Sequence, residues 1–167
     1  IYEQQKNYSK MISAIDRIEL ADGSSEDITL SKMKVYEMMN DKKAAYNTLK
    51  SLSDKHPNDL SYKVMLGNWL MQNKRQKDAY KIFIDAIKEE PDNAFVQTSL
   101  YDYYKTVGQD TLANVLMERI LTSPKTESQS KISMIQQLIR DNEQEGGDST
   151  KMLKLFNRMM QANPKDG

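Results

Sequence analysis

The chain of 167 residues balances 24 lysines and arginines against 24 aspartates and glutamates, and it has one histidine and no cysteine. The balanced charge argues against a surface for nucleic acid or acidic lipid, because either surface needs an excess of Lys and Arg. The lack of cysteine excludes disulfides, thiolate nucleophiles and cysteine-ligated zinc. No stretch supplies the roughly 18 apolar residues that a membrane-spanning helix requires.

Apolar residues recur at spacings of three and four, which predicts helices, and no segment alternates with the period of a strand. Aspartates and asparagines at the breaks, among them Asp41, Asn93 and Asp110, are suitable N-caps, and Thr126 with Gln129 fits a capping box. In chain order we expect nine helices, at 5–19, 26–40, 42–55, 60–73, 76–89, 94–107, 110–122, 127–141 and 149–162.

The sequence repeats itself with a period of about 34 residues, within the range typical of helical repeats. A shift by that period aligns Tyr36, Leu70, Tyr104 and Leu138. The step from Leu138 to Met152 is five residues longer than the equivalent steps, such as Tyr104 to Ala113, so the linker at 141–148 has gained these residues. A second pattern, with spacings of four, three and five, recurs as Ala45-Leu49-Leu52-Pro57, Ala79-Phe83-Ala86-Pro91 and Met152-Phe156-Met159-Pro164, with Ala113-Met117-Ile120 as a copy whose Pro124 comes one residue early.

This pattern resembles the tetratricopeptide repeat, a pair of helices in about 34 residues. The unit at 60–93 matches best, with Leu66-Gly67, Leu70, Ala79, Phe83, Ala86 and Pro91. The resemblance implies an all-α, right-handed superhelix of about nine antiparallel helices. It implies a single domain over 1–167, made of a half repeat at 5–25 and repeats at 26–59, 60–93, 94–127 and 128–167.

Most aromatic residues and methionines of the pattern should pack in the core, above all Tyr36, Leu66, Phe83, Tyr104 and Phe156. Three departures stand out. Lys63 replaces the aromatic residue that opens the motif, and Lys32-Met33 replaces Leu-Gly. Met152 replaces a small alanine, so we expect wider helix spacing in the last repeat.

No residues assemble a recognisable catalytic constellation, so we expect neither an enzyme nor a cofactor. His56 has no second histidine or cysteine as partner, and we expect it at the surface near a helix C-terminus. The acidic insertion at 141–148 alternates acids like a calcium loop, but Met152 stands where the bidentate Glu belongs, so we expect a solvated linker and no metal. Lys74, Arg75 and Lys77 beside Asp78 indicate a solvated turn.

In tetratricopeptide-repeat proteins the first helix of each pair lines a concave groove, so the resemblance implies that this face binds a peptide or helix of a partner protein. Only Asn68 and Lys34 fit the basic clamp with which some members hold acidic C-termini, so we expect a partner segment that is neutral overall. The groove candidates follow by spacing, and they are Leu30, Lys34, Val64, Asn68, Met71, Thr98, Asp102, Lys105, Ile132, Gln136 and Ile139.

An alternative is an assembly segment that packs on its own polypeptide or associates with itself. Apolar residues on the first and last helices, such as Ile12, Leu153 and Met160, lead us to expect that the chain is cut from a longer array. The sequence leaves the compartment open. Its Lys-, Asn-, Met- and Ile-rich composition is similar to that of repeat proteins from some gut bacteria, many of them exported or periplasmic.

Overall fold

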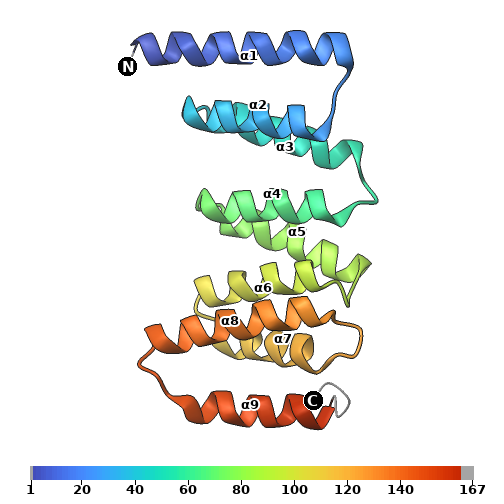
Figure 1. Ribbon diagram of the computed structural model, residues 1–167, viewed down its shortest axis with the longest axis vertical. Helices are drawn as coiled ribbons and strands as arrows, with labels where there is room; N and C mark the ends of the chain where they lie inside the picture. The colour runs from blue at the N-terminus through green and yellow to red at the C-terminus, as the bar shows by residue number, and fades with distance from the viewer. Residues whose placement is uncertain (1, 163–167) are drawn as a thin grey trace. The chain divides into compact units, whose positions relative to one another are not determined.

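The computed structural model describes residues 2–162, which form helices joined by short turns, with no strand among them (Figure 1). This confirms the predicted all-α fold. Most helix ends agree with the prediction to within two residues, whereas the first helix is three residues longer at each end and the eighth ends three residues later. The helices are α1 (Tyr2–Asp22), α2 (Glu26–Met38), α3 (Lys42–Lys55), α4 (Leu60–Gln72), α5 (Gln76–Glu89), α6 (Ala94–Thr106), α7 (Asp110–Thr122), α8 (Ser128–Gln144) and α9 (Ser149–Ala162).

The chain divides into two compact units, one up to Leu66 and one from Gly67 onward, so that the division falls inside α4. In the first unit α1 packs on α2, and α2 packs on α3. In the second unit α5 packs on α6, α6 on α7, and α7 on both α8 and α9. In five of these six pairs the two helices follow one another in the chain, which is the packing of a helical repeat.

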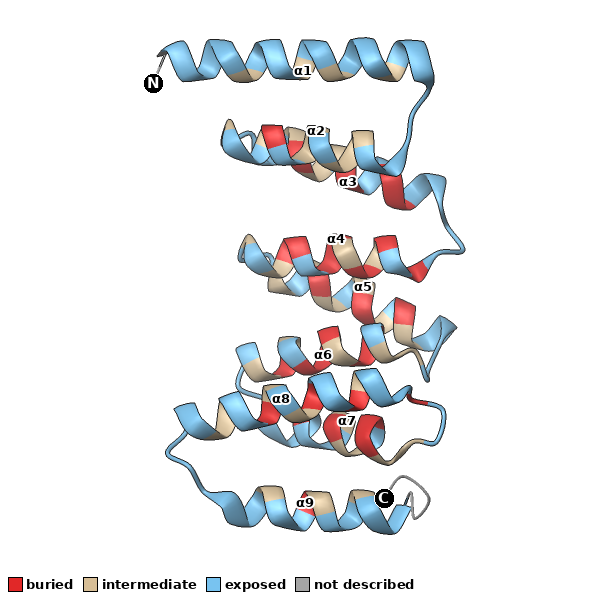
Figure 2. Ribbon diagram, viewed as in Figure 1, coloured by how far each residue is buried: buried red, intermediate tan, exposed pale blue. Residues whose placement is uncertain are grey.

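Side chains at the predicted repeat positions form the core. Ala45, Leu49 and Leu52 are buried on α3, and the matching residues Ala79, Phe83 and Ala86 are buried on α5. Because the spacing of four and three keeps each trio on one helical face, the opposite face remains in solvent (Figure 2). The copy at Ala113, Met117 and Ile120 on α7 is buried as well.

The two terminal helices are the most exposed. No described residue of α1 is buried, and on α9 the buried residue is Leu155 (Figure 2). The prediction of core positions is therefore wrong for Phe156, which is half-buried, and likewise for Tyr36 on α2. Pro164, which closes the last copy of the pattern, lies outside the described residues.

Gly67 lets α4 approach α5 closely. A Cβ atom built on Gly67 would overlap the ring of Phe83, with Cζ of that ring only 2.8 Å away. Phe83 has no exposed surface, so its ring cannot move outward without disturbing the core. The small residue that the repeat pattern places here is thus required by packing.

The turn that closes the first helix of each pair has the same geometry three times. Asn40, Lys74 and Gly108, which occupy equivalent positions in successive repeats, adopt left-handed conformations with φ of 57°, 61° and 73°. This is the Schellman ending of a helix, in which the following amide reaches back to a carbonyl five residues earlier. The bonds are Asp41 N to Tyr36 O (2.9 Å), Arg75 N to Leu70 O (2.9 Å) and Gln109 N to Tyr104 O (2.8 Å).

The insertion lengthens α8 instead of forming a loop. The corresponding turn bond runs from Gly147 N to Asn142 O at 2.8 Å, four residues later than the position of Leu138 in the repeat. Gly146 and Gly147 then lead into α9, with φ of 106° and 78°. Four of the five inserted residues therefore become an extra helical turn, which corrects the expected linker over 141–148.

Two of the predicted helix caps form. The Asp41 side chain accepts a hydrogen bond from Ala44 N, and Asn93 accepts hydrogen bonds from Phe95 N and Val96 N. Two predictions are wrong. Asp110 lies inside the first turn of α7, after the N-cap Gln109. The capping box does not form either, because α8 begins after Glu127 and Thr126 is buried among other side chains.

Candidate functional site

The α6 candidates lie on one helical face, because Thr98, Asp102 and Lys105 follow one another at spacings of four and three. Thr98 and Lys105 are half-buried and Asp102 is exposed. Surrounding protein nevertheless removes part of the water around the Asp102 carboxyl, and this raises its pKa to about 6, with a further contribution from the negative charge of Asp141 on α8. Asp102 follows Tyr101 and precedes Lys105, the two residues of α6 that bond to acids at the end of α8.

The α8 candidates form an exposed stripe with apolar ends. Ile132 and Ile139 are seven residues apart and are 46% and 40% exposed, and Gln136 lies between them on the same face. Leaving two isoleucines half in water costs hydrophobic free energy that burial would recover. This stripe is the most apolar part of the predicted groove within the second unit.

Two interactions tie α6 to α8. The Tyr101 hydroxyl donates a hydrogen bond to Oδ2 of Asp141 at 2.8 Å, and burial followed by this bond raises the pKa of the phenol. Lys105 Nζ lies 2.7 Å from Oε1 of Glu145, and this bond raises the pKa of the lysine. Asp141 stands on the extra turn of α8 and Glu145 is the C-cap of that helix, so the insertion supplies both contacts between α8 and α6.

The other candidates contribute less to this face. On α4, within the second unit, Asn68 is exposed and Met71 is half-buried. In the first unit Leu30 is half-buried and Lys34 is exposed. Val64, in contrast, is only 7% exposed, so its side chain offers little surface to a ligand.

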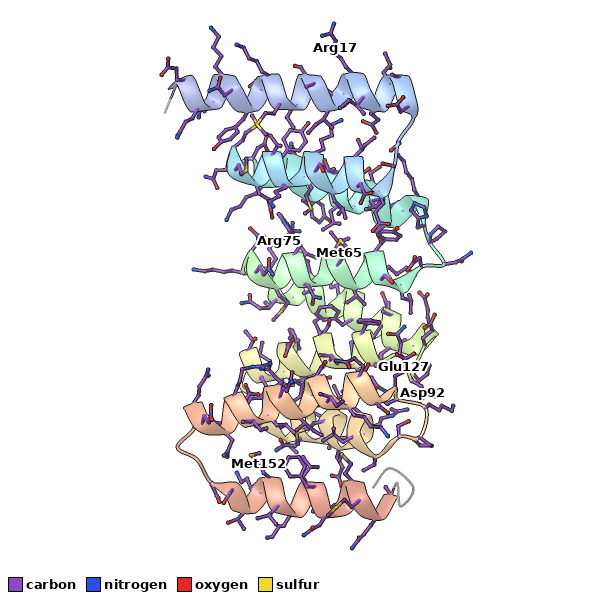
Figure 3. All side chains as sticks on the ribbon, in the orientation of Figure 1. Arg17, Met65, Arg75, Asp92, Glu127 and Met152 are labelled. Carbon is purple, nitrogen blue, oxygen red and sulfur yellow. The ribbon has the colours of Figure 1, made fainter. Side chains whose placement is uncertain are left out.

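The second unit also contains a cavity of about 300 Å³ between α6, α7, α8 and α9. Its floor is formed by Met117, Leu138 and Leu155, which are buried, and Met152 lines it from α9 (Figure 3). The cavity exists because α9 packs on α7 instead of closing against α8. Sequence reasoning did not find it, although the exchange of alanine for Met152 led us to expect wider helix spacing here.

The remaining chemical candidates are ordinary surface features. His56 is exposed at the C-terminal end of α3, as predicted, where its ring lies 4.9 Å from the ring of Tyr62. In the basic turn, Arg75 pairs with Asp78 at 2.8 Å. Among residues 2–162 no three His, Cys, Asp or Glu side chains are grouped so that they could hold a metal ion.

No protein-family model matches this sequence, and no curated protein matches it. Within the described part of the chain, no helix is long and apolar enough to cross a membrane. The assignment to a helical repeat therefore depends on the internal periodicity and on the packing of neighbouring helices.

Proposed function

We propose that this chain is a tetratricopeptide-repeat protein. Two features that share its period support the proposal. The left-handed turn residues Asn40, Lys74 and Gly108 occupy the same position in three successive repeats. Gly67 and Phe83 meet as the small and the large residue of one helix pair. Helical pairs of this kind serve many proteins as binding scaffolds, with extended surfaces formed by stacked repeats.

We further propose that the face formed by α6 and α8 binds a peptide or helix of a partner protein. The observation that carries this proposal is the half-exposed pair Ile132 and Ile139, which lies on one face of α8. Two apolar anchors about two helical turns apart suit an amphipathic helix or an extended peptide. Lys105 is already paired with Glu145, so the face offers little net charge and suits a neutral partner.

Selection from a displayed peptide library on the immobilised full chain tests the proposal. Selected peptides should lose most of their affinity for Ile132→Ser/Ile139→Ser. Leu112→Ser/Val115→Ser on α7 is the matched control, because those side chains are also 45% and 60% exposed, and it should bind normally. Asn68→Ala/Asp102→Ala should also weaken binding. Peptides that bind all of these variants equally would contradict a site on α6 and α8.

The face of α9 supports a second function, association between copies of the chain. Leu153 and Met160 are seven residues apart on one stripe and are 59% and 60% exposed. Sedimentation velocity over a range of concentrations separates the two functions. Self-association that disappears in Leu153→Ser/Met160→Ser would favour assembly, and a monomer at all concentrations would leave peptide binding as the function.

A further inference from the structure

The cavity between α6, α7, α8 and α9 combines an apolar floor with charged walls. Met117, Leu138 and Leu155 are 8%, 9% and 7% exposed and form the floor. The volume of about 300 Å³ is at the lower end of the range for small-molecule sites. Met117 and Met152 line the cavity with flexible thioethers that adapt to the shape of a ligand.

The acids around this cavity all have partners. Asp110 and Glu145 both pair with Lys105 Nζ, at 3.2 and 2.7 Å. Glu118 pairs with Arg158 at 2.7 Å, and Asp141 accepts the hydrogen bond from Tyr101 described above. A cationic ligand would therefore have to displace an existing bond to reach any of these carboxylates.

Two lysines of the cavity wall remain without such partners. Lys151 and Lys154, one helical turn apart on α9, form no side-chain hydrogen bond or ion pair with another described residue. The hydrogen bond from Thr150 N to the Asp148 carboxylate lowers the pKa of Asp148, and the charges of the two lysines add a smaller contribution. The cavity lining carries four acids and four bases, so its net charge is zero, and the bases without a hydrogen bond or ion pair to another described residue are the two lysines of α9.

We propose that this cavity binds a small amphipathic carboxylate, with its apolar tail on Met117, Leu138 and Leu155 and its carboxylate at Lys151 and Lys154. Burying the tail removes apolar surface of both the ligand and the cavity floor from water, which favours binding. The carboxylate gains charge-assisted hydrogen bonds from two ammonium groups that have no competing partner. This site differs from the face of α6 and α8 and does not depend on the proposed peptide binding.

Titration of the full chain with straight-chain carboxylates, followed by amide chemical shifts, tests this site. Affinity should rise about fourfold for each methylene added from pentanoate until the cavity is full. Shifts should appear at Asn114, Leu138 and Lys154, which line the cavity. Octanol should bind about tenfold more weakly than octanoate, and octylamine more weakly still. Equal affinity for the three octyl compounds would overturn the proposal.

Two variants locate the carboxylate. Lys151→Gln/Lys154→Gln should weaken octanoate about tenfold and leave octanol unchanged, because only the charge contact is removed. Lys77→Gln/Lys81→Gln on α5 removes the same charge from exposed side chains outside the cavity and should bind octanoate normally. Asn114→Trp should block all ligands by filling the cavity from α7. Octanoate affinity that is unchanged in the α9 variant would refute the site.

A carboxylate with an apolar neighbour exists on free fatty acids and on the C-terminus of an apolar peptide. Titration with a tetrapeptide ending in two leucines, once with a free carboxylate and once as the amide, distinguishes these sources. Binding of octanoate alone assigns the site to fatty acids, and carboxylate-dependent binding of the peptide alone assigns it to chain ends. If neither ligand shifts the cavity residues, the proposal is wrong.

Discussion

Tyr101 on α6 and Asp141 on α8 are joined by a hydrogen bond of 2.8 Å between the phenol hydroxyl and Oδ2 of the carboxylate. Tyr101 is only 2% exposed, so this bond forms at the edge of the core. Asp141 also accepts a hydrogen bond from Gln137 on its own helix, which holds the carboxylate in place. One buried phenol thus sets the distance between the helices that carry the candidate binding face.

Removal of this hydroxyl should loosen α8. Tyr101→Phe keeps the ring and its packing but leaves the carboxylate with one protein partner fewer, which should cost about 1.5–3 kcal/mol of unfolding free energy. Urea unfolding measures the change, with Tyr8→Phe on the exposed α1 as the control. A loss no larger than that of the control would mean that water replaces the phenol without cost.

The contact between Gly67 and Phe83 predicts that one methyl group added at position 67 lowers the stability of the chain. Alanine is normally better than glycine inside a helix by about 1 kcal/mol. Gly67→Ala should nevertheless destabilise the chain by about 1–3 kcal/mol, because the new Cβ overlaps the buried ring. Asn68→Ala, at the exposed neighbouring position of α4, is the control and should be neutral or stabilising. Thermal melting of the two variants checks the sign.

The left-handed turns predict opposite effects for two substitutions. Lys74 has φ of 61°, so Lys74→Gly should relieve strain and stabilise the chain by about 0.5–1 kcal/mol. Gly108 has φ of 73° with open space around it, so Gly108→Ala should destabilise by about 1 kcal/mol through the backbone alone. Urea midpoints that move in the same direction for both would contradict the shared turn geometry.

Because the pKa of Asp102 is raised, replacing this residue with asparagine should increase the unfolding free energy by an amount that depends on pH. Because its folded value of about 6 lies above the ordinary value of about 3.9, the group favours the folded state at low pH. That contribution is lost as the pH rises from about 4 to about 6. Asp102→Asn should therefore stabilise the chain at pH 7.5 by about 1 kcal/mol, a figure reduced for solvent exposure, and should change little at pH 4. Urea unfolding at both values, with the exposed Asp85→Asn as control, measures the difference.

Most of the fold could be predicted from the sequence, because the same pattern of small and large residues recurs in several repeats. A single set of small and large residues at spacings of four and three is ambiguous, but Ala45, Ala79 and Ala113 recur in phase and all are buried. Prediction failed where the period breaks. Nothing in the acidic stretch at 141–148 distinguishes a linker from another turn of helix, and only contacts with α6 decide the matter.

The binding role of the groove candidates stays a prediction, and the sequence could assign only the helices that carry them. Periodicity assigns Asp102, Ile132 and Ile139 to their helices, and all three side chains are exposed in the structure. The cavity beneath α9 depends instead on the packing of α9 on α7, which leaves a space between α9 and α8. Sequence spacing records which residues share a face, but it does not record the distance to a neighbouring helix, so the free lysines of α9 could not be assigned to a cavity wall.

The extra turn of α8 also rotates the path of the chain. Each residue turns an α-helix by about 100°, so four additional residues add about 400°, a full circle and about 40° more. Compared with the end of α6, the chain therefore leaves α8 about 6 Å farther along the helix axis. Its direction around the axis differs by about 40°. Because of this rotation, α9 starts away from the surface of α8, on which the second helix of a pair would normally pack. The insertion thus changes the direction in which the chain leaves α8, and this accounts for the packing of α9 on α7.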